Sequence, residues 1–214
     1  NLGYDNVLDD SVRTASIDTV TNLNVSNDSI ADLTGIEDFA ALTELNCYGN
    51  QLTSLDVSNN AALQKLYCWN NQLTSLGSNN PALTNLRCQY NQFTSLDVSN
   101  NASLTDFLCS DNQLTSLDIR NGNNVNINTS FTASNNPNLY CIDVDNAAWS
   151  TANWTNIDFG TSFSENCSLA GCVDSLACNY NSLAWIDDGS CILPDGCTDS
   201  LACNYDASAS CDDG

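Results

Sequence analysis

A short motif repeats almost without change through the first half of the chain. Its four clearest copies are spaced 21, 20 and 21 residues apart and begin at Leu42, Leu63, Leu83 and Leu104. The third copy reads LTNLRCQYNQFTSLDVSNNAS, and the others keep its cysteine, the asparagine three residues after that cysteine and nearly all of its leucines. A weaker copy starts near Val20, and a degenerate one follows the fourth as far as Val144. A fixed period of this length predicts stacked repeats over residues 20–144.

Each copy contains one short stretch in which apolar and polar residues alternate, such as Leu45-Asn46-Cys47. Alternation buries every second residue, which suits a single β-strand. Because the next such stretch comes a whole repeat later, neighbouring strands must pair in parallel through a crossover. The returning part of each copy has no apolar pattern of helix length, so it should be extended or turn-like. We therefore expect a parallel β-solenoid with little helix.

The pattern L-x-x-L-x-C-x-x-N-x-L-x-x-L resembles that of the leucine-rich repeat family over residues 20–144. The resemblance implies a leucine-rich repeat solenoid with a parallel sheet on its concave side. The recurring cysteines should be buried free thiols that act as small apolar groups. The recurring asparagines should form an amide ladder that satisfies backbone groups of the turns. These columns are Cys47, Cys68, Cys88 and Cys109, and Asn50, Asn71, Asn91 and Asn112.

The polar strand positions between the buried ones vary between copies, as expected for a binding surface on a common scaffold. Aromatic side chains, two of the four cations and several amides gather there, a combination that suits protein or glycan recognition. We predict that a protein or glycan ligand binds this concave face. The predicted contact residues are Tyr48, Lys65, Tyr67, Trp69, Arg87, Gln89 and Tyr90. The main alternative is a structural stalk that spaces other domains and binds nothing.

Composition argues against several other functions. The chain has 26 acidic and 4 basic residues, a formal charge of -22 and no histidine. Such acidity repels nucleic-acid phosphates, and catalysis by a Ser-His-Asp triad is excluded. A two-carboxylate glycosidase would need Glu44 and Asp106 together, but they fall on separate repeats of an open face, so we expect no enzyme. A hydroxyl ladder from Thr53-Ser54 to Thr115-Ser116 leaves ice binding as a further alternative, although such hydroxyls commonly stabilise turns.

Twelve cysteines favour an oxidising compartment. No apolar run approaches the roughly 20 residues that span a bilayer, and the absence of a leader before Asn1 predicts a mature or trimmed product. We expect a secreted or outer-surface protein that is monomeric.

Capping segments should close the solenoid at residues 1–19 and 145–167. Residues 145–167 resemble the C-terminal closure of secreted leucine-rich repeat proteins of marine Bacteroidetes-type bacteria, which implies a bacterial surface or secreted location. Cys141 and Cys167 bracket this stretch, and we predict a disulfide between them. Closing such a loop stabilises by about 3 kcal/mol in the chain-entropy model.

Residues 168–214 carry a second repeat, of 25 residues. GCVDSLACNYNSLAWIDDGSC starts at Gly171 and GCTDSLACNYDASASCDDG starts at Gly196. Both resemble GCxDxxACNYxxxAxxxDDGSC modules found near the C-termini of such secreted proteins, and the second copy is expected to be truncated. Modules this small cannot fold on core burial alone. We expect disulfides Cys172–Cys191 and Cys203–Cys211, although sequence alone leaves the connectivity open.

The modules also repeat a set of Asp and Asn side chains in a part of the chain without basic residues. Several carboxylates held close together in so small a fold repel one another and destabilise it, unless a divalent cation neutralises them. Oxygen ligands suit Ca²⁺, although the spacing is not that of an EF-hand and turn formation is the alternative. The predicted Ca²⁺ ligands are Asp174, Asn179, Asn181, Asp187, Asp188, Asp199, Asn204, Asp206, Asp212 and Asp213.

Overall fold

The computed structural model describes residues 17–127, 130–169, 171–182, 184, 187–193, 196–201, 203, 205–209 and 211. Most of the expected N-terminal cap, at 1–19, lies outside the described residues, and so do the predicted calcium ligands Asn204, Asp212 and Asp213. The chain divides between Glu165 and Asn166 into two compact units, which are described separately below.

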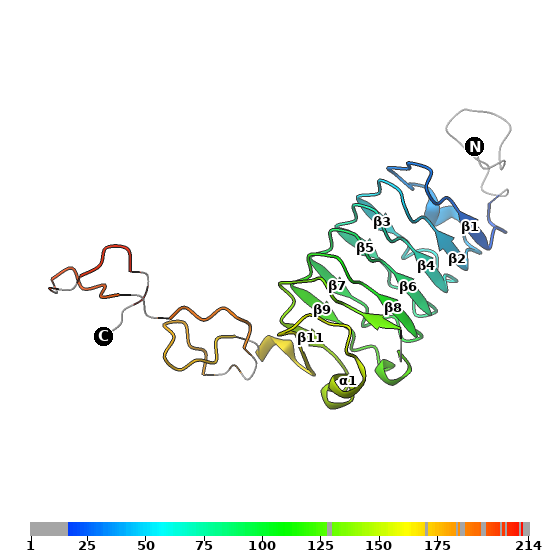
Figure 1. Cartoon of the computed structure of the whole chain (residues 1–214). Coiled ribbons are helices and arrows are strands. Elements are labelled where there is room, and N and C mark those ends of the chain that lie inside the picture. Colours follow the sequence, from blue (N-terminus) through cyan, green and yellow to red (C-terminus); the bar gives the residue numbers. More distant parts are fainter. Residues whose placement is uncertain are drawn as a thin grey trace. The chain divides into compact units, whose positions relative to one another are not determined.

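The first unit is a parallel β-solenoid, as predicted (Figure 1). Successive coils each contribute one strand to a six-stranded sheet with the order β1-β2-β4-β6-β8-β10. The strands are β1 (Asn22–Asn24), β2 (Glu44–Asn46), β4 (Lys65–Tyr67), β6 (Asn85–Arg87), β8 (Asp106–Leu108) and β10 (Phe131–Thr132). Equivalent repeat positions pair directly, since Leu66 is the partner of Leu45 on one side and of Leu86 on the other. We refer to the outer surface of this sheet as the concave face.

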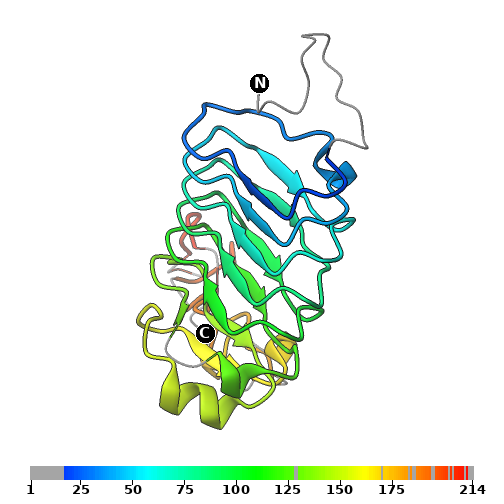
Figure 2. The ribbon, with the colours of Figure 1, turned by 90° about the vertical axis from the view of Figure 1, so that its right-hand side faces the viewer.

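The returning side of each coil is extended, which confirms the prediction of little helix. In the first of two further parallel sheets, β3 (Ser54–Asp56) pairs with β5 (Ser75–Gly77). The second sheet has the order β12-β11-β9-β7 and contains β7 (Ser95–Asp97), β9 (Ser116–Asp118), β11 (Cys141–Asp143) and β12 (Ser162–Ser164). The described residues form one α-helix, α1 (Ala147–Asn153), and the 3-10 turns η2 (Ile36–Asp38), η3 (Asn124–Asn126) and η4 (Cys167–Leu169). Figure 2 shows the coils of the first unit stacked along its length.

One coil lacks a residue on this return side. The segment between Gly77 and Asn80 is one residue shorter than its counterparts in the coils before and after it, and Ser78 stands where those coils bury Val57 and Val98. A Cβ atom at Gly77 would lie 2.3 Å from Oδ1 of Asp56. Glycine at this position therefore allows the close approach of the preceding coil.

Apolar columns fill the interior of the solenoid. The strand column Leu45, Leu66, Leu86 and Phe107 is completely buried, and so is the thiol column Cys47, Cys68, Cys88 and Cys109. All eight belong to one continuous core cluster. Since each coil buries its apolar residues against its neighbours, stacking supplies the core that no single repeat could form. The four column cysteines are free, as predicted.

An asparagine ladder closes the turn after each concave strand. The Nδ2 of Asn91 donates to the carbonyl oxygens of Cys88 and Cys68, each at 3.1 Å, while its Oδ1 accepts from the N–H of Leu73 at 2.9 Å. The same pattern is made by Asn50, Asn71, Asn112 and Asn136. The predicted amide ladder is confirmed and continues into the degenerate coil.

A second asparagine ladder, which the sequence did not suggest to us, runs along the return side. The Nδ2 of Asn80 donates to the carbonyl oxygens of Val57 and Asn60, at 3.0 and 2.9 Å. Asn60 and Asn101 make equivalent bonds to their own preceding coils. Each coil is therefore joined to the previous one by buried amides at two separate turns.

Aromatic side chains cover the last coils of the first unit. Trp154, which ends α1, is 2 % exposed, and its ring lies 4.3 Å from that of Phe131. Its Nε1 donates to the carbonyl oxygen of Ile127 at 2.6 Å. Phe163 of β12 contacts both rings. The segment 145–167, expected to be a cap, thus supplies two of the aromatic side chains in this cluster.

The second unit, residues 166–214, contains two disulfides that the structure assigns directly. Cys172 bonds Cys191, which is the expected pair. The expected Cys203–Cys211 pair is wrong, because Cys211 bonds Cys178 of the preceding module. The carbonyl oxygen of Ile192 accepts from the Cys178 N–H and lies 3.5 Å from the Sγ of Cys211, whereas Cys203 is exposed and free.

Cys141 and Cys167 are both disulfide-bonded, as their predicted pairing requires. All 12 cysteines of the chain fall among the described residues. Six of them are free: the four of the solenoid column, together with Cys197 and Cys203.

Candidate functional site

The concave face brings the predicted aromatic residues into contact across neighbouring coils. Tyr48 and Trp69 stack with 4.3 Å between ring centroids and 8° between ring planes. Tyr67 of β4 is the strand partner of Arg87 of β6, whose guanidinium carbon lies 5.6 Å from the tyrosine ring centroid. Both contacts follow from the repeat, because residues one period apart lie side by side on adjacent parallel strands.

Each cation of this face is neutralised by a carboxylate on a neighbouring strand. Lys65 Nζ lies 3.4 Å from Oε2 of Glu44, and Arg87 Nη2 lies 2.8 Å from Oδ2 of Asp106. The hydrogen bond that Arg87 donates to the Asp106 carboxylate raises the pKa of Arg87. Pairs this exposed add little stability, typically below about 1 kcal/mol. Their main consequence is a locally neutral surface in a strongly acidic chain.

The two pairs also separate the carboxylates that a glycosidase would require. Glu44 and Asp106 lie on β2 and β8, with β4 and β6 between them. Three strand spacings place them roughly 14 Å apart, beyond the roughly 5–9.5 Å between the carboxyl groups of glycosidases. The geometry gives no support to that alternative.

Two amide oxygens on the concave face lack partners among the described residues. Asn46 Oδ1 and Gln89 Oε1 are both shielded from solvent, and no described group donates to either. A shielded acceptor without a donor costs about 1–3 kcal/mol. Since neither oxygen is exposed, neither is available to a ligand in this arrangement of side chains.

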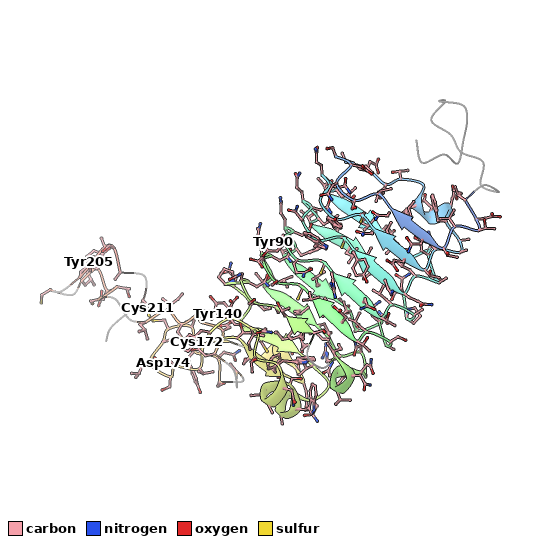
Figure 3. The ribbon with its side chains drawn as sticks, turned by 45° about the vertical axis from the view of Figure 1, so that its right-hand side comes forward. Tyr90, Tyr140, Cys172, Asp174, Tyr205 and Cys211 are labelled. Atoms are coloured by element: carbon pink, nitrogen blue, oxygen red, sulfur yellow. A yellow bond between two sulfur atoms is a disulfide. The ribbon has the colours of Figure 1, made fainter. Side chains whose placement is uncertain are left out.

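Tyr90, the last of the predicted contact residues, projects from the turn directly after β6 (Figure 3). Its side chain is 57 % exposed, and its backbone is left-handed, with φ of 54°. All seven predicted contact residues therefore come from three successive coils. The sequence had indicated this grouping but not the stacking, the ion pairs or the unusual backbone of Tyr90.

Two threonines of the hydroxyl ladder on the return side are bonded within the fold. Thr74 Oγ1 donates to the carbonyl oxygen of Thr53 at 3.3 Å, and Thr115 Oγ1 donates to that of Thr94 at 3.2 Å. Both bonds join neighbouring coils, whereas the ordinary role considered from the sequence was stabilisation of the turn.

The predicted calcium ligands that the structure describes make local turns. One side-chain oxygen of each described aspartate in the set accepts the N–H of the residue two positions later, at 2.8–3.1 Å: Asp174, Asp187, Asp188, Asp199 and Asp206. Asn179 bridges Ser190 and Ile192 through its amide. Asn181 donates its backbone N–H to Cys172. Within the described part of the chain, no three acidic or thiol side chains gather as a metal site would require.

The stacked coils, the asparagine ladder and the thiol column together define a leucine-rich repeat protein. No family model matches the chain. The chain is 45 % identical over 51 residues to internalin J of Listeria monocytogenes serotype 4b, a match that covers 24 % of this chain and 6 % of that protein. The solved functional domain of the Listeria monocytogenes protein InlJ, described as including a cysteine ladder, is 35 % identical with a TM-score of 0.51.

That structural match covers 62 % of this chain and 32 % of the InlJ domain, so the chain spans less than a third of its relative. YopM from Yersinia enterocolitica matches at 25 % identity with a TM-score of 0.35, over 58 % of this chain and 24 % of YopM. The column of Cys47, Cys68, Cys88 and Cys109 is the feature that the InlJ description names. None of the described helices is long and apolar enough to cross a bilayer.

Proposed function

We propose that this protein is a secreted or cell-surface recognition protein that binds a protein or glycan ligand through its concave face. The observation that carries the proposal is the contact group of Tyr48 with Trp69 and Tyr67 with Arg87 on an open sheet surface. Stacked aromatic rings and an oriented arginine are the side chains that contribute most to binding interfaces. The role is binding without catalysis.

The charge distribution supports the same proposal. The chain carries a formal charge of -22, yet the two carboxylates and two cations at the centre of the concave face cancel. A repulsive field of uniform sign would hinder contact with most acidic surfaces outside cells. Neutralisation at the centre of the face instead permits close approach.

A triple variant tests this proposal. The Tyr67→Ala, Trp69→Ala and Arg87→Ala changes remove both contact pairs and should abolish capture of ligands on glycan arrays and in extracellular-protein binding screens. A matched triple variant on the return side, Thr74→Ala, Ser75→Ala and Ser95→Ala, should bind as the wild type does. If the wild-type protein captures ligands and the concave variant captures them equally well, the site is wrongly placed. If the wild type captures nothing in either format, the structural stalk replaces the recognition role.

A separate proposal concerns residues 168–214, which we infer to bind Ca²⁺. It is supported by the repeated Asp and Asn set and by the absence of any basic residue after Arg120. Three of the ten predicted ligands lie outside the described residues, and no three of the described aspartates gather at one point. The proposal therefore rests on the chemistry of the donor set alone, and a direct test is given in the Discussion.

A further inference from the structure

Tyr90 occupies a backbone position that the other coils fill with residues suited to a left-handed conformation. The equivalent turn residues all have φ between 55° and 68°, and they are Asn27, Gly49, Asn70, Asp111 and Asn135. Glycine, asparagine and aspartate adopt this conformation readily, whereas for a bulky aromatic residue it is an outlier. A tyrosine here is therefore unfavourable compared with the residues that its neighbours use.

The fold gains nothing visible from the tyrosine side chain. The Tyr90 N–H donates to the carbonyl oxygen of Ser110 and its carbonyl accepts from the N–H of Asn71, both at 3.2 Å, but any residue would make these backbone bonds. No ring contact or side-chain hydrogen bond joins Tyr90 to another residue in the described part of the chain, and 57 % of it is exposed. Strained residues that are not required by packing concentrate at functional sites.

A second exposed aromatic residue lies on the same edge of the solenoid. The Cys109 N–H donates to the carbonyl oxygen of Thr132, and the Ala133 N–H donates in the same way to that of Asn156. Asn156 therefore occupies, in the next coil, the position that Thr132 occupies in its own. Phe159 comes three residues after Asn156, just as Asn135 comes three residues after Thr132. The neighbouring Asp158 accepts from the N–H of Asn135, so Phe159 lies beside the last turn of this row, although the left-handed residue here is Gly160, with φ of 94°. The Phe159 side chain is fully exposed.

The geometry of the neighbouring rings favours a protein partner over a glycan. A sugar packs on the flat face of an aromatic ring, and the Tyr48–Trp69 stack and the Arg87 contact with Tyr67 already occupy one of the two faces of each ring. Tyr90 instead protrudes, which suits insertion into a pocket of a partner surface. The charge of -22 favours a partner with a basic surface, since opposite charges accelerate encounter.

We propose that Tyr90 is an anchor side chain that inserts into an apolar pocket of a basic protein partner, with Phe159 providing a second contact on the same edge. This inference rests on the proposed recognition function and names the class of its partner. Backbone strain at Tyr90 is retained because the exposed ring is needed for binding.

The decisive variant is Tyr90→Asn, which installs the residue that three other coils use at this position. The probe is an array of folded extracellular proteins in three classes, with basic, acidic and near-neutral net charge. The wild type should bind members of the basic class, and Tyr90→Asn should weaken that binding by about tenfold or more. Its thermal unfolding midpoint should stay equal or rise. Tyr140→Asn, a change to an exposed tyrosine beside β11, should leave binding unchanged.

The outcomes separate the two proposals. If the concave triple variant loses protein binding but Tyr90→Asn keeps it, the anchor role is wrong and the recognition function stands. If Tyr90→Asn lowers the unfolding midpoint by several degrees, Tyr90 is a structural residue and the inference fails. Binding to a glycan array without binding to any protein class overturns the partner class. If wild type binds neither array, both proposals fail.

Discussion

The side-chain nitrogen of Asn91 lies 3.1 Å from the carbonyl oxygen of Cys68, one coil earlier in the solenoid. The same side chain bonds Cys88 in its own coil and accepts the N–H of Leu73 from the preceding one. A single buried amide thus satisfies backbone groups of two coils at once. Because this arrangement recurs from Asn50 to Asn136, the coils are held at a constant spacing along the sheet.

Removing one rung of this ladder should be costly. Asn91→Ala leaves several buried backbone groups without partners, and each such group costs about 1–3 kcal/mol. We expect the free energy of unfolding to fall by about 2–4 kcal/mol, measured by urea denaturation. The adjacent exposed residue provides the control, since Gln92→Ala should change stability by less than about 0.5 kcal/mol. Equal effects of the two substitutions would remove the structural role assigned to Asn91.

The thiol column predicts a loss of stability in alkali. Burial raises the pKa of Cys47 from 9.0 to about 12 and shifts the pKa of Cys68, Cys88 and Cys109 in the same direction. Below pH 9 the thiols are protonated in the folded and unfolded states alike, so burying them contributes in full to the free energy of unfolding. Above pH 9 the unfolded chain loses thiol protons that the folded chain keeps. Stability should therefore fall between pH 9 and about 12, by up to about 1.4 kcal/mol per pH unit for each thiol.

Urea titrations at pH 8, 9 and 10 measure this slope directly. A Cys88→Ala variant lowers the baseline stability but should also reduce the alkaline slope by about 1.4 kcal/mol per pH unit, since it removes one titrating group. A variant with the wild-type slope would show that the alkaline loss has another source.

Cysteine mapping of the native protein tests the connectivity of the second unit. Mass spectrometry should find Cys172 linked to Cys191 and Cys178 linked to Cys211. An alkylating reagent should modify exposed Cys203 before denaturation and the buried thiols only after it. A Cys203–Cys211 link would instead restore the connectivity expected from the sequence.

Calcium binding has a direct calorimetric test. Titration of Ca²⁺ into the chelator-treated full chain should release or absorb heat with defined stoichiometry, and EDTA should make residues 168–214 more sensitive to protease. Asp174→Asn with Asp199→Asn should weaken binding, because each change removes a carboxylate from one module. The matched control is Asp145→Asn, which changes an exposed aspartate of the first unit. Unchanged protease sensitivity and an absence of heat would leave these aspartates as turn residues only.

The period of the repeat was enough to predict the parallel sheet, the buried columns and the grouping of Tyr48 with Trp69, since each follows from stacking equivalent positions. The second asparagine ladder was missed because an Asn-Asn pair beside serine is equally typical of an exposed turn. The Cys178–Cys211 bond was missed because it joins two modules, and sequence spacing suggests only pairs that close one module. The strain at Tyr90 becomes visible only when its backbone is compared with the same turn in other coils.

The coil shortened between Gly77 and Asn80 carries a consequence for how such a protein changes over time. Its concave strand β4 keeps full register with both neighbours despite the missing residue. Insertions and deletions on the return side therefore leave the spacing of the recognition residues intact, whereas one on the concave strand would shift every contact after it. Length variation among related sequences should accumulate on the return side, and whole coils should be exchangeable as cassettes that carry new contact residues.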